Sequence, residues 1–408
     1  MLVVDRETIA ICFQVYLLID LVYFLLIIME VVITGISLIS ALGENLNRNW
    51  SNLLQGKTAI RIEQPFADLP PLPLAKISEK QANLSELINK LINDVLTDAK
   101  LTPPLLDCDV IIGSSRSFQY IWENIAINYI KNEKIDKINF LETLPNIPAI
   151  IAAKIIGTQS IVSTYQGACA TGIIALAQGF DLIKWGKSQR VIVGVIETAI
   201  TPLTITGFKQ MGAIASSGCY PFDVNREGLV LGEGGAFFVL ESAHLARERK
   251  AKIYGKISGY GLTNDACYMY APSPDQKSAI TAIKDCLYRS NLYPENIDYI
   301  HSHGTGTKLN DQYEVRLIEK LFKPSIPISS TKGATGHTLG ASGGLGVAFC
   351  LMALQSNIIP PCVGLKQPEY PLNFITKAQE KELKNILCLS FGFGGQNAAI
   401  AISKYGNY

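Results

Sequence analysis

The sequence predicts an α/β protein built from two similar halves. Short apolar runs of strand length alternate with stretches of helical periodicity, which is typical of βαβ units. The order of strands and helices that follows Glu30 then begins again near residue 249. The composition agrees, because 408 residues with a hydrophobic share of 48% fit a large globular protein and exclude a disordered chain.

The first half is expected to cover residues 30–248. Its elements alternate between buried apolar runs and helices with one apolar face, so parallel βαβ units are predicted. The expected strands are Val31–Ile39, Val110–Gly113, Ser160–Thr164 and Arg190–Glu197. The expected helices carry Leu46, Trp50, Leu53 and Leu54, then follow Pro148, and then carry Ile173, Ala177 and Phe180.

The second half is expected to cover residues 249–408 and to repeat this order. Its expected elements are a strand at Ile253–Tyr260, a helix with Ile280, Ile283 and Leu287, a strand at Asp298–Ser302, and a helix with Val315, Ile318 and Phe322. Open parallel sheets form ligand crevices at the carboxyl ends of their strands. Because both halves place reactive side chains after a strand, a site between the halves is predicted.

Residues 1–29 form a separate hydrophobic extension. Ile9–Ile28 is long enough for one membrane span at about 1.5 Å per residue, and only Gln14 and Asp20 interrupt it. The segment is a start-site artefact with Met29 as the true first residue, a membrane-associated helix, or a buried helix. A core strand at Val31 leaves almost no linker below a bilayer, so membrane contact through residues 9–28 is doubted.

Charge and cysteine content exclude some classes of protein. The chain has 36 basic and 35 acidic residues, so no basic excess indicates binding to nucleic acid. Nine cysteines without a CxxC pair give no zinc-ribbon signature and no disulfide framework. Free thiols in a reducing cytosol, and therefore a cytoplasmic protein, are expected.

Cys169 is the candidate nucleophile. It lies in "QGACATG", residues 166–172, where small neighbours would let a ligand come close. It also stands at a predicted helix start, where the macrodipole favours a thiolate and a free N–H can stabilise an oxyanion. The alternative is a small buried core cysteine.

Three of the four histidines fall in two short motifs. His301 and His303 lie in "HSHGTGT", and His337 lies in "KGATGHTLGASGG". The glycine-rich surroundings of His303 and His337 favour a functional site. We expect His301 to be structural, and His244 to be a surface residue of a helix.

Four motifs, "GACATG", "HGTGT", "KGATGHTLGASG" and "SFGFGGQN", resemble those of the elongating β-ketoacyl-acyl carrier protein synthases of the thiolase superfamily. The resemblance covers residues 30–403. It implies a thiolase fold, with two topologically similar halves in α-β-α-β-α layers, and a homodimer. It also implies decarboxylative Claisen condensation of an acyl chain with malonyl-acyl carrier protein, in fatty acid or related lipid or polyketide synthesis. Neither a metal nor another cofactor is implied, because acyl carrier protein delivers the substrates on phosphopantetheine.

The resemblance also assigns roles in catalysis. Cys169 would hold the acyl group as a covalent intermediate. His303 and His337 would face the malonyl thioester and stabilise the enolate that forms as carbon dioxide leaves. Phe393 would gate the acyl pocket, and its N–H with that of Cys169 would form the oxyanion hole.

Supporting roles follow from the same resemblance. Lys332 would hold the histidine network by its charge, and Thr305 and Thr307 would bind the pantetheine amides. Asp311 and Glu314 match two acidic positions behind the site. From the residues alone, this acidic pair is a capping pair at the start of the helix that follows, and both roles are compatible.

The chain departs from the family pattern at two places. The family usually carries a glutamate nine residues after the second histidine, where this chain has Gly346. Glu314 is therefore expected to be the acidic partner of Lys332. "GSSRSF" at Gly113–Phe118 replaces a more glycine-rich, apolar run near the acyl pocket and places Arg116 there. Acyl length and substrate type are therefore not transferred from the family.

Three other functions remain as alternatives. A chain-length-factor-like subunit would be non-catalytic, but such subunits lack the cysteine that Cys169 supplies. A non-decarboxylating thiolase-like acyltransferase would use a second cysteine where this chain has His337. A cysteine hydrolase of the α/β-hydrolase type needs a G-x-nucleophile-x-G turn, and "GACAT" lacks the last glycine.

Overall fold

The computed structural model describes residues 29–133 and 137–406. Of the hydrophobic extension at residues 1–29, only Met29 is among them. The predicted segment Ile9–Ile28 lies outside the described residues, so the three alternatives for it stay predictions.

Ten strands form one hydrogen-bonded sheet in the order β11-β10-β14-β15-β9-β1-β8-β6-β4-β5. A short antiparallel pairing of β1 with β9 joins two groups of strands. The first group is β1 (Val31–Ser40), β4 (Asp109–Gly113), β5 (Val162–Tyr165), β6 (Arg190–Glu197) and β8 (Gly234–Ser242). The second group is β9 (Gly255–Asn264), β10 (Tyr299–His301), β11 (Ile328–Ser329), β14 (Asn385–Gly392) and β15 (Gln396–Ser403).

The two groups have the same topology. In the first, β4 pairs parallel with β5 and β6, and β8 pairs antiparallel with β6 and β1. In the second, β10 pairs parallel with β11 and β14, and β15 pairs antiparallel with β14 and β9. The prediction of two repeated halves is confirmed, and β10 is the counterpart of β4. The predicted parallel units are present as β4, β5 and β6 in the first group and β10, β11 and β14 in the second, whereas β8 and β15 run antiparallel to their neighbours. The division at residues 248 and 249 stays a prediction.

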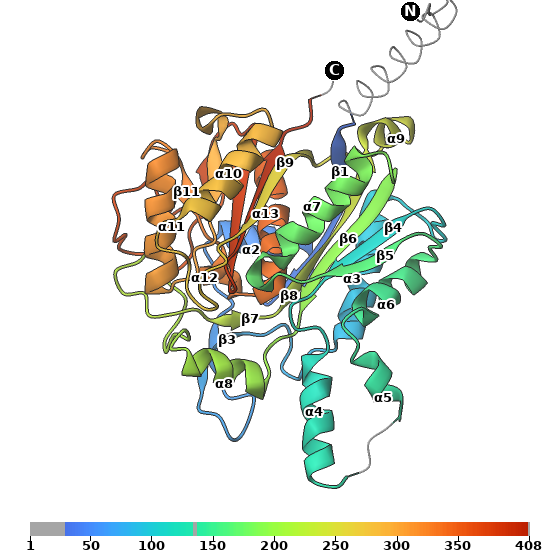
Figure 1. Cartoon of the computed structure of the whole chain (residues 1–408). Helices are drawn as coiled ribbons and strands as arrows, with labels where there is room; N and C mark the ends of the chain where they lie inside the picture. Colours follow the sequence, from blue (N-terminus) through green and yellow to red (C-terminus); the bar gives the residue numbers. More distant parts are fainter. Residues whose placement is uncertain (1–28, 134–136, 407–408) are drawn as a thin grey trace, which may run out of the picture.

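Helices lie between and outside the two groups of strands (Figure 1). Helices α2 (Leu46–Leu54), α7 (Thr171–Lys184) and α13 (Ser342–Ser356) share one core with the inner faces of both groups. Helices α3 (Leu84–Ala99) and α6 (Ile147–Ile156) cover the outer face of the first group. Helices α10 (Lys277–Arg289) and α11 (Lys308–Leu321) cover the outer face of the second group. The predicted α-β-α-β-α layers are therefore confirmed.

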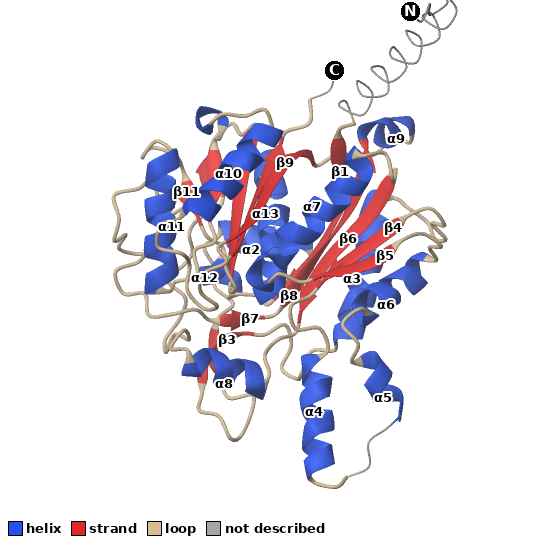
Figure 2. Cartoon of the chain, in the orientation of Figure 1, coloured by secondary structure: helices blue, strands red, loops and turns tan. Residues whose placement is uncertain are grey.

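The remaining elements are short or lie at the edges of these layers (Figure 2). The helices are α4 (Gln119–Ile130), α5 (Lys137–Glu142), α8 (Pro202–Gln210), α9 (Ala243–Glu248) and α12 (Lys332–Thr335). The 3-10 turns are η1 (Ala168–Ala170), η2 (Pro294–Asn296) and η3 (Leu339–Ala341). The small strands are β2 (Arg61–Glu63), β3 (Leu72–Ala75), β7 (Leu231–Gly232), β12 (Ile358–Ile359) and β13 (Gln379–Glu380).

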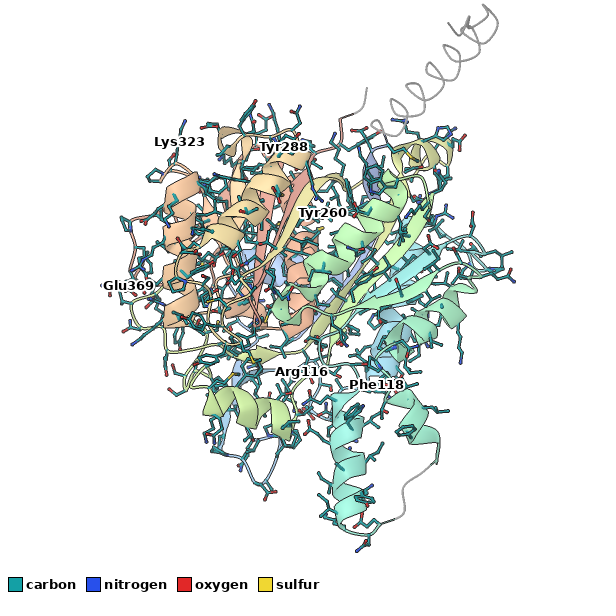
Figure 3. All side chains as sticks on the ribbon, in the orientation of Figure 1. Arg116, Phe118, Tyr260, Tyr288, Lys323 and Glu369 are labelled. Carbon is teal, nitrogen blue, oxygen red and sulfur yellow. The ribbon has the colours of Figure 1, made fainter. Side chains whose placement is uncertain are left out.

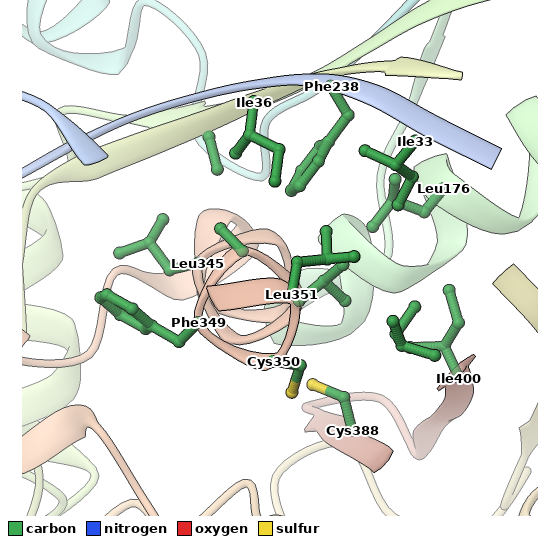
Figure 4. Packing of buried hydrophobic residues seen from close by; sticks show 14 of the residues in the cluster. Ile33, Ile36, Leu176, Phe238, Leu345, Phe349, Cys350, Leu351, Cys388 and Ile400 are labelled. Atoms are coloured by element: carbon green, nitrogen blue, oxygen red, sulfur yellow. The ribbon is translucent and has the colours of Figure 1, made fainter. Parts of the chain in front are cut away.

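Helix α13 runs through the centre of the core, as Figure 4 shows. It approaches α7 so closely that a Cβ atom on Gly172 would lie 2.4 Å from the backbone nitrogen of Gly344. Glycines in the motifs around Cys169 and His337 thus let two central helices touch. Among the described residues, one helical stretch, Leu339–Ser356, is apolar and long enough to cross a membrane, and it is this central helix.

Candidate active site

Four loops meet where parallel strands of the two halves end. They follow β4 at Ser114, β5 at Gln166, β10 at Ser302 and β11 at Ser330. Because β10 is the counterpart of β4, the "HGTGT" loop is the repeat of the "GSSRSF" loop. The counterpart of the Cys169 loop is the one that follows β11.

Cys169 lies in the turn η1, directly before α7, and is 6% exposed. The hydroxyl of Thr171 fixes this turn, because it accepts from the Gly167 N–H at 2.9 Å and donates to the Ala168 carbonyl at 2.7 Å. Ala168 has a φ of 48°, which few non-glycine residues adopt. The turn therefore places the thiol at the start of a helix, in a buried position.

The structure brings the three predicted catalytic residues together. The Cys169 sulfur and one ring nitrogen each of His303 and His337 all lie within 4.8 Å of one another. The two imidazole rings stand edge to face, with centroids 5.4 Å apart at 82°. We refer to these residues as the Cys-His-His trio.

Lys332 orients His303. Its ammonium donates to the His303 carbonyl and lies 3.3 Å from Nδ1 of the same residue. Since an ammonium group only donates, Nδ1 accepts and the ring hydrogen lies on Nε2. On the other ring, Nδ1 of His337 lies 2.8 Å from the hydroxyl of Ser342, the first residue of α13.

Burial dominates the electrostatics of the site. It lowers the pKa of both His303 and His337 well below the ordinary value, and the charge of Lys332 lowers both further. Burial also lowers the pKa of Lys332, against the opposing charge of Glu314. Burial raises the pKa of Cys169 to about 11, although Lys332 opposes this. At neutral pH the trio is therefore uncharged, and the expectation of a thiolate at the helix start is wrong.

Glu314 lies behind the loop that carries His303. Its carboxylate accepts from the backbone N–H of His303 at 2.6 Å and of Gly304 at 2.7 Å. Burial raises its pKa to about 7, and these two hydrogen bonds oppose the rise. Among residues 29–133 and 137–406, no carboxylate forms an ion pair with Lys332, so Glu314 acts on Lys332 through space rather than by contact.

Asp311 shapes the same loop. It accepts from the backbone N–H of Thr305 at 3.1 Å and of Gly306 at 3.2 Å. Burial raises its pKa, and hydrogen bonds such as that from the Phe222 N–H oppose the rise. The N-cap of α11 is Thr307, so the prediction that Asp311 and Glu314 cap this helix is wrong.

Gly346 leaves no room for the glutamate that the family usually carries. A Cβ atom there would lie 2.9 Å from Cε1 of His301 and 3.0 Å from the sulfur of Cys388. His301 is buried, and its Nε2 lies 3.2 Å from the hydroxyl of Thr331. In Figure 4 the sulfur of Cys388 faces that of Cys350 across the same small space. His301 therefore has packing contacts here, as expected for a structural residue.

Two cavities meet at Cys169. The first, of about 90 Å³, is lined by the trio and by Thr305 and Thr307, whose hydroxyls lie 2.9 Å apart. The second, of about 320 Å³, is also lined by Cys169 and includes Arg116, Gln166 and Gln396 in its walls. Phe393 is 38% exposed and lines both cavities, and its ring centroid lies 5.9 Å from that of Phe208. This is the position that a gate between the two cavities would need.

Sequence reasoning missed two supporting residues. Ser342 fixes the ring of His337, and its place in the quoted "KGATGHTLGASGG" motif was an available signal. Glu197 is buried at the end of β6 and accepts hydrogen bonds from the hydroxyls of Ser114 at 3.2 Å and Ser115 at 2.6 Å. An acidic residue that ends an otherwise apolar strand was the signal there.

The trio also has ligand types that bind metals such as Zn²⁺, namely one cysteine and two histidines. The prediction that the site needs no metal stays a prediction.

Comparisons with known proteins identify the family of the chain. Residues 75–246 match the N-terminal domain and residues 254–366 the C-terminal domain of beta-ketoacyl synthases. A 3-oxoacyl-[acyl-carrier-protein] synthase 2 of Synechocystis sp. is 31% identical over 413 residues, which cover 92% of this chain and 98% of that protein.

Comparison with solved structures confirms the fold. A type II polyketide ketosynthase in complex with its acyl carrier protein has a TM-score of 0.87 and 24% identity, covering 93% of this chain and 100% of that one. The ishigamide ketosynthase/chain length factor has a TM-score of 0.85 and 25% identity, with the same coverage. The fold is thus the thiolase fold of ketosynthases. The chain belongs to the beta-ketoacyl synthase family and is an acyltransferase.

Proposed function

We propose that this chain condenses an acyl group held on Cys169 with malonyl-acyl carrier protein, in fatty acid or related lipid or polyketide synthesis. The observation that carries the proposal is the meeting of the Cys-His-His trio within 4.8 Å, at the junction of two cavities. One cavity can receive the acyl chain while the other receives the pantetheine arm.

The first half-reaction loads the enzyme. The neutral Cys169 thiol gives its proton to a neutral histidine of the trio as its sulfur attacks the thioester carbonyl. The carbon–sulfur bond to pantetheine breaks, and the departing thiolate takes that proton. The backbone N–H of Phe393 already donates to the Cys169 sulfur, so it lies close to where the oxyanion forms.

The second half-reaction forms the new carbon–carbon bond. Malonyl-pantetheine enters the first cavity, where Thr305 and Thr307 offer hydroxyls to its amides. Carbon dioxide leaves, and the electron pair of the broken bond becomes an enolate beside the neutral rings of His303 and His337. The enolate carbon attacks the acyl carbonyl, the bond to Cys169 breaks, and its sulfur leaves as a thiolate that takes a proton from water. Every group in this sequence belongs to the chain, its substrates or water, so we propose that no cofactor takes part.

Intact-mass measurement after mixing with acyl-carrier substrates tests the proposal. Cys169→Ala should form no acyl-enzyme and no product. His303→Ala and His337→Ala should still be acylated, more slowly, through the histidine that remains, and should release no carbon dioxide. Cys267 is exposed and lies outside both cavities, so Cys267→Ala is the matched control and should behave as wild type.

The same experiment separates the alternatives. A non-catalytic partner subunit would show no acyl-enzyme in the wild-type protein. A thiolase-like acyltransferase would condense acyl groups without releasing carbon dioxide.

The partners that we propose are acyl carrier protein and a second copy of the chain. β5 is the last strand of the sheet, and the neighbouring Ile161 is 56% exposed. The structure describes all of α4, and in it no residue is buried, with Trp122 and Ile130 exposed. An open strand edge and a helix with exposed apolar side chains both favour association with another chain. Analytical ultracentrifugation should give a dimer.

We also propose a cytoplasmic location. All eight cysteines among the described residues are free, which suits a reducing compartment.

A further inference from the structure

The second cavity contains a cation beside the nucleophile. Its walls include Cys169, Phe393 and Arg116. Arg116 is exposed, and Figure 3 shows it between the two halves, above α4. Its positive charge lowers the pKa of Cys169 slightly, so it lies within electrostatic reach of the thiol.

The loop that carries Arg116 is fixed in place. The hydroxyl of Ser114 accepts from the N–H of Ser117 at 2.7 Å, and the N–H of Gln119 donates to the Arg116 carbonyl at 3.1 Å. The carboxylate of Glu197 accepts from both the N–H and the hydroxyl of Ser115. The backbone on both sides of Arg116 is thus held before any substrate arrives.

The guanidinium of Arg116 is available to a ligand. Within the part of the chain that the structure describes, it makes no ion pair and no side-chain hydrogen bond. Glu197 interacts with it through space, but the two carboxylate oxygens of Glu197 already accept hydrogen bonds from Ser114 and Ser115, and burial raises the pKa of this carboxyl. The side-chain amides of Gln166 and Gln396 line the same cavity, whereas Leu339 and Phe208 supply apolar wall.

We propose that the second cavity accepts short acyl chains that end in a carboxylate, and that Arg116 binds this carboxylate. This inference rests on the proposed loading of Cys169. A guanidinium fork matches a carboxylate with two parallel hydrogen bonds, which an alkyl terminus cannot form. At roughly 30 Å³ per heavy atom, the size of a water molecule in the liquid, a cavity of about 320 Å³ holds a short chain of about ten heavy atoms.

The test compares two probes of equal carbon number, hexanoyl-pantetheine and adipoyl-pantetheine. We expect kcat/KM for acylation of Cys169 to be about tenfold or more higher with the adipoyl probe, the effect of one charge-assisted hydrogen bond. Arg116→Met should bring the ratio of the two values close to one, and Arg116→Lys should keep part of it. Because both probes react with the same thiol, the ratio cancels any effect of Arg116 on its reactivity.

The matched control is Arg61→Met, which removes an exposed positive charge from β2, outside both cavities. It should keep the wild-type ratio. Equal rates with both probes in the wild-type protein, or a preference that survives in Arg116→Met, would overturn the inference.

A failure of the proposed function would give a different experimental result from a failure of this inference alone. If acetyl-pantetheine and both probes all leave Cys169 unmodified, the proposed loading step is wrong, and the inference falls with it. If acetyl-pantetheine loads Cys169 but no carboxylate preference appears, only the inference is wrong.

Discussion

Gly172→Ala should push apart the two central helices and separate the catalytic groups. The new Cβ atom would lie 2.4 Å from the Gly344 nitrogen, whereas ordinary contact begins at 3.4 Å, so a gap of 3.4 − 2.4 = 1.0 Å must open. The atom that it meets belongs to backbone, which cannot rotate away as a side chain would. Helix α7 begins two residues after Cys169, and α13 begins five residues after His337.

The expected magnitudes follow from this displacement. Inserting a methyl group into a packed contact costs about 1–3 kcal/mol. A misplacement of about 1 Å between reacting groups can cost about 10²-fold in rate. We therefore expect both lower stability and a loss of Cys169 acylation of one to two orders of magnitude.

The matched control is Gly207→Ala in α8. A Cβ atom on Gly207 meets nothing within 4 Å, so this variant gains the helix propensity of alanine without a clash. The urea midpoint, followed by circular dichroism, and the acylation rate are measured for both variants. If Gly172→Ala matches Gly207→Ala in both measurements, then the close crossing of α7 and α13 does not set the geometry of the site.

Three further perturbations test the electrostatics and packing. Because burial raises the pKa of Cys169 to about 11, its alkylation by iodoacetamide should accelerate about tenfold per pH unit from pH 7 to pH 10. Burial raises the pKa of Glu233 from 4.5 to about 7, so the folded state binds its proton more tightly than the unfolded state. The contribution of Glu233 to stability therefore falls as pH rises from 4.5 to 7, and Glu233→Gln should be more stable than wild type at pH 8, by at most ~3 kcal/mol, but not at pH 4. Gly346→Glu should destabilise the protein by several kcal/mol, because its side chain meets the buried ring of His301 and has no free partner there.

Each of these three predictions has an experimental outcome that would contradict it. Mass spectrometry assigns the alkylated cysteine, and a Cys169 rate that is already flat above pH 7 would indicate a thiolate. Urea denaturation at pH 4 and pH 8 measures the stability of Glu233→Gln relative to wild type. If this stability difference is the same at both pH values, Glu233 titrates alike in the folded and unfolded states. Gly346→Ala adds only the Cβ atom and is the comparison for Gly346→Glu. Wild-type stability of the glutamate variant would mean that His301 can move aside.

The features that the sequence predicts best are strands and motifs, which depend on the residues of one short segment. The apolar run Arg190–Glu197 is strand β6 at the predicted bounds, and the two histidine motifs do converge on Cys169. The sequence predicts poorly the features that depend on contacts between distant segments, such as helix packing and burial. Small residues around Cys169 were attributed to ligand approach, yet Gly172 is needed for a helix crossing with α13. Likewise, burial of the thiol by the whole fold outweighs the helix end that was expected to favour a thiolate.

The repeated topology explains how two different loops can serve one reaction. Since β4 and β10 are counterparts, the loop with Arg116 and the loop with His303 leave equivalent positions in the two halves, and each lines one of the two cavities that include Cys169. Carboxylates fix both loops through backbone N–H groups, Glu197 for the first and Glu314 for the second. In the second loop the functional group is the buried, neutral imidazole of His303, suited to an enolate, and in the first it is the exposed guanidinium of Arg116, suited to a carboxylate. One scaffold that is duplicated thus supplies two rigid platforms, and the side chain that each presents determines whether it acts on the bond-forming carbon or on the far end of the acyl chain.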